Sequence, residues 1–196
     1  MENLFMAGTL LMLLLFYGIY ITKMLLQRKR GIVTNQMGKG NKKGQTLAVE
    51  RVLGVVSWLI VAVQVFSIFT QWSMLPDNAR FTGILTGFLG DIIFGIAVYT
   101  MRDSWRAGIP EEGKTEMITA GIYGYSRNPA FLGFYFLYIS VLLVYFNPAL
   151  LIATVITIAV FHLQVLQEEK YLESVFGEKY TVYKKTVFRY LGRKGR

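Results

Sequence analysis

The side chains best suited to chemistry lie in two polar segments of the chain, residues 102–130 and 167–196. In the first segment, Arg127 is followed by Asn128 and Pro129. Because proline keeps the residue before it out of the helical region, we expect a helix to begin at Pro129 with Asn128 as its cap. The unpaired N–H groups of a helix start, together with the forked guanidinium of Arg127, could bind a carboxylate. Alternatively, Arg127 only anchors the chain at an interface and Asn-Pro merely starts the helix.

The second segment begins with an acidic pair, Glu168 and Glu169, directly after an apolar run. Two carboxylates there could hold ribose hydroxyls or balance a cation. They could equally form a solvated face that pairs with nearby basic residues. Further along, apolar and aromatic residues recur every three or four positions from Tyr171 to Val187. This pattern predicts helices that lie on a membrane or pack under a cytosolic cap, with a break at Gly177.

Several kinds of site are excluded by residue types alone. The chain has no cysteine and a single histidine, His162. A catalytic thiol, a disulfide framework, a thiolate zinc site and any site of two imidazoles are therefore excluded, and we predict no metal site. His162 could act as a base or contact a ligand, or it could be a structural residue that faces the interior of a helix bundle.

The composition indicates an integral membrane protein. Hydrophobic residues make up 54% of the chain and charged residues 17%, whereas soluble domains have about 45–50% apolar and about 25% charged residues. About 20 apolar residues span a bilayer core, and the chain has apolar runs at residues 4–26, 52–72, 81–101, 131–146 and 149–166. The cations follow the first run instead of preceding it, so we expect a retained anchor rather than a cleaved signal peptide.

We therefore expect an all-α, polytopic integral membrane protein with about five transmembrane helices, followed by cytosolic C-terminal helices. The fourth run has only 16 residues and is separated from the fifth by Asn147 and Pro148. The last two transmembrane helices are thus expected to form a tight hairpin. Because the length allows one domain, residues 1–196 are expected to form a single membrane-embedded domain.

The basic residues predict the orientation of the chain. Of the 21 lysines and arginines, all but Arg80 lie in residues 23–51, 102–127 and 170–196, which five crossings bring to one side. By the positive-inside rule this side is the cytosol, so the N-terminus lies outside the cytoplasmic membrane and the C-terminus inside. Topology and anionic lipid then explain the net charge of +9, and no nucleic-acid partner is expected. Residues 28–51 are predicted to form a mobile basic cytosolic loop.

Asp91 lies inside the third apolar run. An acid within a membrane is a functional candidate by default. It could equally be a packing residue that forms a hydrogen bond with Gln64 or a threonine.

The two polar segments resemble the signature halves of the isoprenylcysteine carboxyl methyltransferase family, which is related to the phospholipid methyltransferases. The resemblance covers roughly residues 85–190 and rests on the order and spacing of several short pieces. These pieces are Ser104-Trp105-Arg106-Ala107-Gly108, Thr119-Ala120-Gly121-Ile122-Tyr123, Ser126-Arg127-Asn128-Pro129, Glu168-Glu169, Leu172, Phe176-Gly177, Tyr180, Tyr183 and Arg189.

The resemblance implies an enzyme that binds S-adenosylmethionine in a cytosolic pocket formed by residues 102–130 and 167–196. Its partners would be a lipophilic small-molecule or lipid-linked substrate, which enters from the bilayer, and membrane lipids. The implied catalytic residues are Arg127, Glu168 and Arg106. The implied cofactor-binding residues are Gly121, Tyr123, Tyr125, Arg127, Asn128, Pro129, Gly133, His162, Glu168 and Glu169. The family often has histidine at the position of Asn128, and an amide cannot take up a proton.

Methyl transfer from a sulfonium is an in-line displacement, so holding donor and acceptor together supplies much of the rate. If the acceptor is a carboxylate, such as that of an isoprenylcysteine-like compound, Arg106 or Arg127 would orient it and no base is needed. If the acceptor is an amine or a thiol, Glu168, Glu169 or His162 would have to remove a proton.

Two other functions remain open at this stage. One is an NADPH-dependent membrane reductase of the sterol type, whose C-terminal region carries similar arginine, proline and acidic elements. The other is a non-catalytic membrane binding protein that keeps the same fold. The sequence leaves the acceptor and the oligomeric state open.

Overall fold

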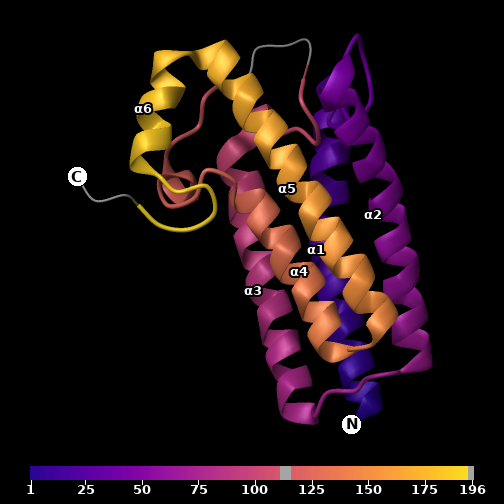
Figure 1. The fold of residues 1–196 in the computed structure, drawn as a ribbon. Coiled ribbons are helices and arrows are strands. Elements are labelled where there is room, and N and C mark those ends of the chain that lie inside the picture. Colours follow the sequence, from indigo (N-terminus) through magenta and orange to yellow (C-terminus); the bar gives the residue numbers. More distant parts are fainter. Residues whose placement is uncertain (111–115, 194–196) are drawn as a thin grey trace.

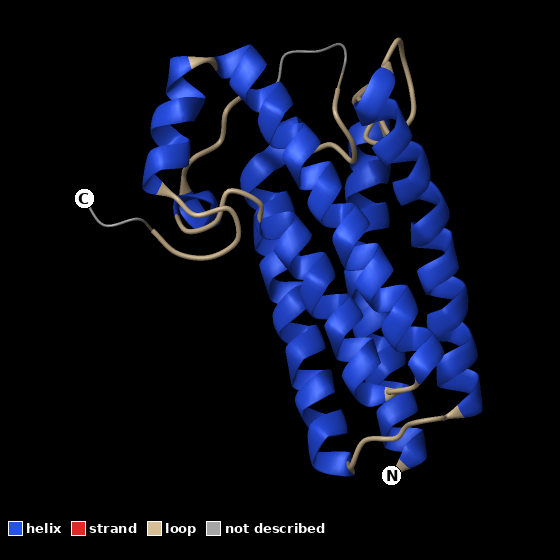
Figure 2. Cartoon of the chain, in the orientation of Figure 1, coloured by secondary structure: helices blue, strands red, loops and turns tan. Residues whose placement is uncertain are grey.

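The chain folds into a bundle of long helices (Figure 1), and the structure, a computed structural model, describes residues 1–110 and 116–193. Parts of both predicted site segments, residues 111–115 and 194–196, lie outside the described residues. Figure 2 shows helices and connecting loops throughout the described chain, which confirms the all-α class. The helices are α1 (Glu2–Lys29), α2 (Gly44–Thr70), α3 (Asp77–Met101), η1 (Arg102–Ser104), η2 (Gly121–Gly124), α4 (Pro129–Val144), α5 (Pro148–Phe176) and α6 (Glu178–Thr186).

Four of the described helices are long and apolar enough to cross a membrane: α1, α2, α3 with its extension through η1, and α5. A further apolar helix, α4, has only 16 residues and packs against α3 and α5. The short α4 and the long α5 form the expected hairpin around Asn147, whose side chain accepts a hydrogen bond from the N–H of Leu150 at 2.9 Å. The prediction of a multi-pass membrane protein is confirmed.

Helix boundaries agree with the sequence at the site segments and differ at α2. Helix α4 begins at Pro129 with Asn128 as its cap, and α5 ends at Phe176, followed by its cap Gly177, whose φ is +52°. Helix α2 begins at Gly44, so residues 44–51 of the predicted loop are helical. Tertiary contact explains this extension, because the hydroxyl of Thr46 bonds to the side chain of Gln167 on α5 at 3.1 Å.

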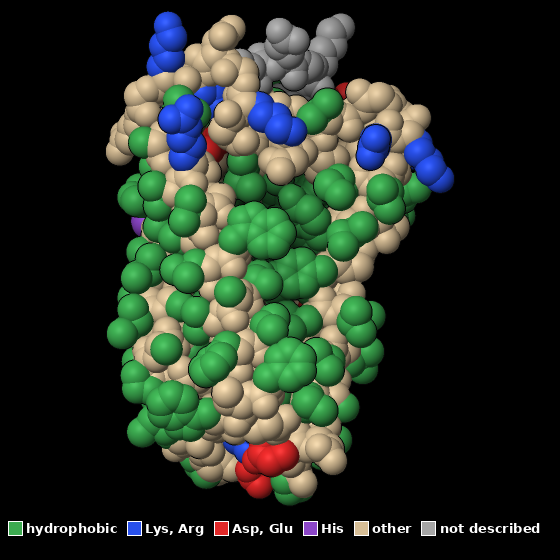
Figure 3. Space-filling view, turned by 90° about the vertical axis from the view of Figure 1, so that its right-hand side faces the viewer, with side chains coloured by type: hydrophobic (Ala, Val, Ile, Leu, Met, Phe, Trp, Pro, Cys, Tyr) green, Lys and Arg blue, Asp and Glu red, His purple; other side chains and the backbone are tan. Residues whose placement is uncertain are grey.

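Charge separates the two ends of the bundle. Figure 3 shows hydrophobic side chains over the middle of one face, lysines and arginines gathered at one end, and a group of acidic side chains at the other. Apart from Arg80, the described lysines and arginines fall in residues 23–51, 102–127 and 170–193. At the opposite end, Arg80 donates to both carboxylate oxygens of Glu2 at 2.6 and 2.7 Å. Below, the end with the two site segments is called the basic end.

Glycines allow α3 and α4 to pack backbone against backbone. A Cβ atom at Gly90 would lie 3.0 Å from the carbonyl oxygen of Gly133, and one at Gly133 would lie 2.8 Å from Cβ of Phe94. The resemblance assigned Gly133 to a cofactor pocket, whereas the structure places it at this contact between helices. The contact sets the position of α4, and hence of the polar residues at its start.

Replacing Gly90 by valine should destabilise the protein by about 1–3 kcal/mol, because overpacking forces the two helices apart. Thermal unfolding in detergent measures the change. The matched control is Gly54→Val on α2, where an added Cβ meets nothing within 4 Å. If both variants unfold at the same temperature, the close approach of α3 and α4 is not a determinant of stability.

Candidate functional site

A buried ion pair joins the two polar segments. Nε and Nη2 of Arg127 donate to Oε1 of Glu169 at 3.1 and 2.8 Å, and the two side chains are only 5% and 4% exposed. The remaining guanidinium nitrogen, Nη1, donates to the carbonyl oxygens of Lys184 and Val187, both at 3.0 Å. Arg127 therefore ties the start of α4 to α5 and to the end of α6.

Glu169 has two further partners. The side-chain amide of Asn128 donates to Oε1 at 3.1 Å, and Arg189 donates to Oε2 through Nε at 3.2 Å and Nη2 at 3.0 Å. The hydrogen bonds to Glu169 raise the pKa of Arg189. Because a buried charge is costly unless it is paired and hydrogen-bonded, these donors are what allow the carboxylate to lie inside the protein.

The carboxyl-terminal residues 187–193 pair with the segment that precedes α4. The N–H of Arg127 donates to the carbonyl oxygen of Phe188 at 3.1 Å, and the N–H of Gly192 donates to that of Tyr125 at 2.7 Å. These backbone bonds and the Arg127–Glu169 pair act on the same short stretch of chain. The network therefore holds the end of the chain against the start of α4.

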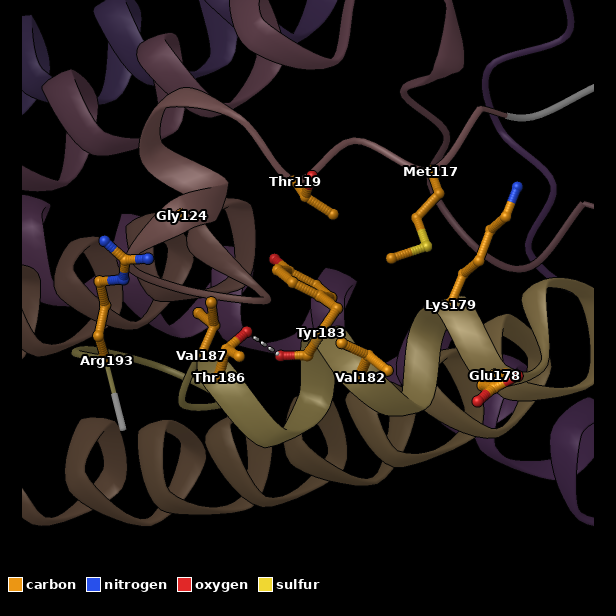
Figure 4. Close-up of a pocket in the computed structure, with 10 residues that line it drawn as sticks. All are labelled: Met117, Thr119, Gly124, Glu178, Lys179, Val182, Tyr183, Thr186, Val187 and Arg193. Carbon is orange, nitrogen blue, oxygen red and sulfur yellow. Dashed lines mark hydrogen bonds between the residues drawn. The ribbon is translucent and has the colours of Figure 1, made fainter. Parts of the chain in front are cut away.

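An open groove of about 600 Å³ lies between α6 and residues 117–124. Figure 4 shows Tyr183 rising from α6, with Met117 and Thr119 across the groove from that helix. The hydroxyl of Tyr183 donates to the carbonyl oxygen of Tyr123 at 2.7 Å, and burial raises the pKa of Tyr183, so it remains a donor at neutral pH. None of the predicted cofactor residues is among the described residues that line this groove.

Glu168 faces a different side of α5 from Glu169 and lines a cavity of about 470 Å³. The cavity lies between α1, α2, α4 and α5, below residues 35–37 and 105–108 of the basic end. Figure 3 shows a hollow among hydrophobic side chains just below the basic residues, on the side of the molecule formed by α2. The lining is mostly apolar and includes Tyr20, Leu53, Trp58, Phe131, Phe134 and Phe161.

One end of this cavity is polar. Nε2 of Gln164 donates to Oε1 of Glu168 at 3.1 Å, and Arg106 lines the same cavity. Burial lowers the pKa of Arg106, which donates to the carbonyl oxygen of Trp105 at 2.8 Å. Oε1 of Gln164 is buried and has no partner among the described residues. Since buried polar atoms are normally bonded, this oxygen marks a place where a ligand could donate a hydrogen bond.

A second buried ion pair lies at the basic end. Nζ of Lys42 lies 2.7 Å from Oε2 of Glu50, and the two side chains are 4% and 0% exposed. Glu50 also accepts from the backbone N–H of Ile109 at 3.0 Å and of Gly38 at 2.7 Å. Residues 31–43 are thereby attached to the 105–109 segment. Sequence reasoning missed Glu50, although an acid just before an apolar run with a lysine nearby was a signal for such a pair.

The structure divides the predicted catalytic residues into two places. Arg106 and Glu168 line the cavity, whereas Arg127 lies in the network around Glu169, with each of its guanidinium nitrogens bonded to the protein. Asn128 belongs to the same network, and Pro129 begins the helix whose first turn reaches the cavity through Ala130 and Phe131.

The other predicted cofactor residues lie outside the described cavity lining. Gly121 has a φ of +60° in the turn of η2, Tyr123 is buried, and Tyr125 is 60% exposed. His162 bonds through Nδ1 to the hydroxyl of Tyr190. Asp91 is buried, and its carboxylate oxygens have no partner among the described residues.

Comparisons with known proteins found one family and three relatives that the chain is similar to. Residues 83–174 match the family model described as the isoprenylcysteine carboxyl methyltransferase (ICMT) family. Three relatives are named protein-S-isoprenylcysteine O-methyltransferase. The Dictyostelium discoideum protein is 25% identical over 137 residues, which is 66% of this chain and 58% of that protein. The Saccharomyces cerevisiae protein is 28% identical over 153 residues, which is 76% of this chain and 62% of that protein. The Xenopus laevis protein is 24% identical over 125 residues, which is 60% of this chain and 43% of that protein.

These matches confirm the resemblance found in the sequence. The segment that matches the family model, residues 83–174, includes Arg106, Arg127, Glu168 and Glu169. The chain spans about 60% of the length of the first two relatives.

Replacing Arg127 by alanine should destabilise the protein by about 3–5 kcal/mol, because it leaves the buried Glu169 without its main partner. The residues after α6 should detach, and limited proteolysis should cut there faster than in the parent. The control is Arg30→Ala, which removes an ion pair whose side chains are 63% and 46% exposed and should change stability by about 0–1 kcal/mol. An Arg127→Ala variant with the parent's proteolysis rate would show that the network does not hold the tail.

Proposed function

We propose, from the match of residues 83–174 to the isoprenylcysteine carboxyl methyltransferase family model, that this chain is a membrane methyltransferase acting on a lipophilic carboxylate. The observation that carries the proposal is the cavity between the helices. Its lining is mostly apolar and includes Arg106 and Glu168, which both lie toward the basic end. Such a site suits a molecule with a hydrocarbon body and one polar reacting group.

The acceptor group is proposed to lie beside Arg106. A guanidinium binds a carboxylate through two parallel N–H donors, which sets its orientation as well as its position. The hydrocarbon part would lie among aromatic residues such as Phe134 and Trp58. An isoprenylcysteine-like compound has both parts, a carboxylate and a long apolar chain.

The residues at the polar end also fit the proposed methyl donor, S-adenosylmethionine. Its sulfonium is a cation, which the carboxylate of Glu168 and the aromatic rings of the cavity would stabilise. Its hydroxyl and amino groups are donors, and Oε1 of Gln164 is a buried acceptor without a partner among the described residues. When bound, the donor would supply a methyl group to the acceptor oxygen and would leave as a thioether, with the carbon–sulfur electron pair retained on sulfur.

No general base is needed for a carboxylate acceptor, since its oxygen already carries the electron pair that forms the new bond. The role of the protein is then to hold the two reactants at near-attack distance. Arg106 would orient the acceptor, and Glu168 would attract the donor. We assign Arg127 and Glu169 to positioning, because they fasten the chain end and the start of α4, whose first turn contributes Ala130 and Phe131 to the cavity.

The site is proposed to face the cytosol. The described cations other than Arg80 lie at the same end of the bundle as Arg106 and Glu168, and the positive-inside rule assigns that end to the cytoplasmic side. The N-terminus, at the other end in Figure 1, would then lie outside the cytoplasmic membrane.

The purified chain in lipid nanodiscs should transfer a labelled methyl group from S-adenosylmethionine to an S-farnesylated cysteine derivative with a free carboxylate. The corresponding primary amide, which lacks the nucleophilic oxygen, should remain unlabelled. Transfer to amine lipids alone would contradict the carboxylate acceptor. Binding of NADPH without any binding of S-adenosylhomocysteine would overturn the methyltransferase.

Replacing Glu168 by glutamine should weaken donor binding about 10- to 100-fold, because a hydrogen bond to a charged group contributes about 1.5–3 kcal/mol. Isothermal titration with S-adenosylhomocysteine and with S-adenosylmethionine measures this, and the loss should be larger for the cationic sulfonium. Glu173→Gln is the control, since Glu173 lies on the same helix with 44% of its side chain exposed. Equal affinities in the two variants would remove Glu168 from the donor site.

Placing a large side chain in the cavity should block the acceptor. Ser57→Phe fills the cavity from α2 and should raise KM for the farnesylated acceptor more than tenfold with little change in donor affinity. Val65→Phe is the control, because Val65 lies on the same helix, is 45% exposed and does not line the cavity. An unchanged KM in Ser57→Phe would place the acceptor elsewhere.

A further inference from the structure

A second apolar groove, of about 640 Å³, lies on the outside of the bundle between α1 and α3. It is separate from the cavity of the proposed active site, because the two are lined by different faces of α1. Tyr17, Tyr20 and Met24 face the cavity, whereas Leu14, Gly18 and Lys23 line the groove.

The body of the groove is apolar and open. Leu14 and Tyr99 are 71% and 84% exposed, and they lie in segments whose composition suits a bilayer. Glycines hollow the groove: an added Cβ at Gly18 would meet nothing within 4 Å, and one at Gly95 would meet only Ile19 Cδ1 at 3.4 Å. From Leu14 to Lys23 the groove is about 13 Å long at 1.5 Å per residue, close to one leaflet of a hydrocarbon core about 30 Å thick.

The basic end of the groove carries an excess of positive charge. Lys23, Arg30 and Arg102 line it together with one acid, Asp103. Arg30 uses Nη1 to bind both carboxylate oxygens of Asp103, at 2.8 and 2.7 Å. Lys23 and Arg102 form no ion pair or side-chain hydrogen bond with any residue in the described ranges 1–110 and 116–193. With three cations and one acid in its lining, the groove carries an excess of two positive charges where apolar surface meets water.

The backbone at Arg102 supports a role for its side chain. Its φ is +48° with ψ −129°, a conformation that side-chain-bearing residues rarely adopt and that glycine adopts easily. An arginine therefore ends α3 at a backbone cost that glycine would avoid. The conformation turns the chain into η1, with Arg102 and Asp103 both lining the groove.

We propose that this groove binds one anionic glycerophospholipid from the leaflet at the basic end. Its phosphate lies between Lys23 and Arg102, and an acyl chain follows the channel past Gly18 toward Leu14. Charge complementarity selects the occupant, because a zwitterionic lipid brings a cation that two unpaired cations would repel. A basic patch near a membrane surface attracts anionic lipid in the same way, and the groove adds a seat for the chain.

Such a lipid would also stabilise the position of α1 beside the proposed active site. Gln27, one turn beyond Lys23 on α1, donates to the carbonyl oxygen of Trp105 at 3.0 Å, and Trp105 and Arg106 line the cavity. The lipid would hold α1 against α3 at the point where α1 supports the polar end of the cavity.

The test measures lipid binding directly, so that it does not depend on the proposed activity. Native mass spectrometry of the detergent-purified full chain is titrated with phosphatidylglycerol and with phosphatidylcholine of identical acyl chains. We expect one phosphatidylglycerol to bind at least tenfold more tightly than phosphatidylcholine. Equal affinities would overturn the proposal. Glycerol phosphate, which has no acyl chains, should not compete; if it displaces the lipid at equal concentration, the groove plays no part.

Two variants locate the site. Lys23→Gln combined with Arg102→Gln should lower the affinity for phosphatidylglycerol about 25-fold, because each cation contributes about fivefold. Gly18→Leu should fill the channel and weaken binding at least tenfold with all charges present. Gly54→Leu, at an equally open glycine of α2, and Arg51→Gln, at an exposed arginine, are the controls. If the controls weaken binding as much as the variants, the lipid binds somewhere other than this groove.

Discussion

A carboxylate that is only 4% exposed must be neutralised by donors within hydrogen-bond distance, and Glu169 meets this requirement with Arg127, Arg189 and Asn128. The donors come from the start of α4 and from the chain after α6, which are far from α5 in sequence. Burying one charge on α5 therefore forces three segments together. The rest of the candidate site follows from that assembly, because it places the first turn of α4 beside the cavity.

The consecutive residues Glu168 and Glu169 illustrate how a helix separates neighbours in sequence. Successive residues point about 100° apart on a helix of 3.6 residues per turn. Glu169 therefore faces the network of arginines, and Glu168 faces the cavity with Gln164. Glu169 is paired with two arginines, whereas Glu168 accepts a hydrogen bond from Gln164 and lines the cavity. Two identical residues that are adjacent in sequence thus have different surroundings, and only Glu168 is proposed to contact a ligand.

The cavity has mostly apolar walls, and a buried ion pair lies near it at the basic end. Aromatic residues from four helices line the cavity. Such apolar walls can contact a hydrocarbon ligand as favourably as they contact lipid chains. At the basic end, the buried Lys42–Glu50 pair attaches residues 31–43 to the 105–109 segment. The Lys42–Glu50 and Arg127–Glu169 pairs are both buried and bonded to backbone groups, which holds polar loops in place at the basic end.

The sequence by itself determined the all-α class, the multi-pass arrangement, the helix start at Pro129, the break at Gly177 and the family resemblance. Hydropathy, the geometry of proline and glycine, and motif spacing are local properties, and they need no knowledge of distant contacts. The assignment of Glu168 and Arg106 to one cavity, of Arg127 to a structural network and of Gly133 to a helix contact was decided only by the tertiary structure. The early start of α2 and the Lys42–Glu50 ion pair were decided there as well. The reason is that the direction of each side chain, and the partner it meets, depends on how helices far apart in the chain pack against one another.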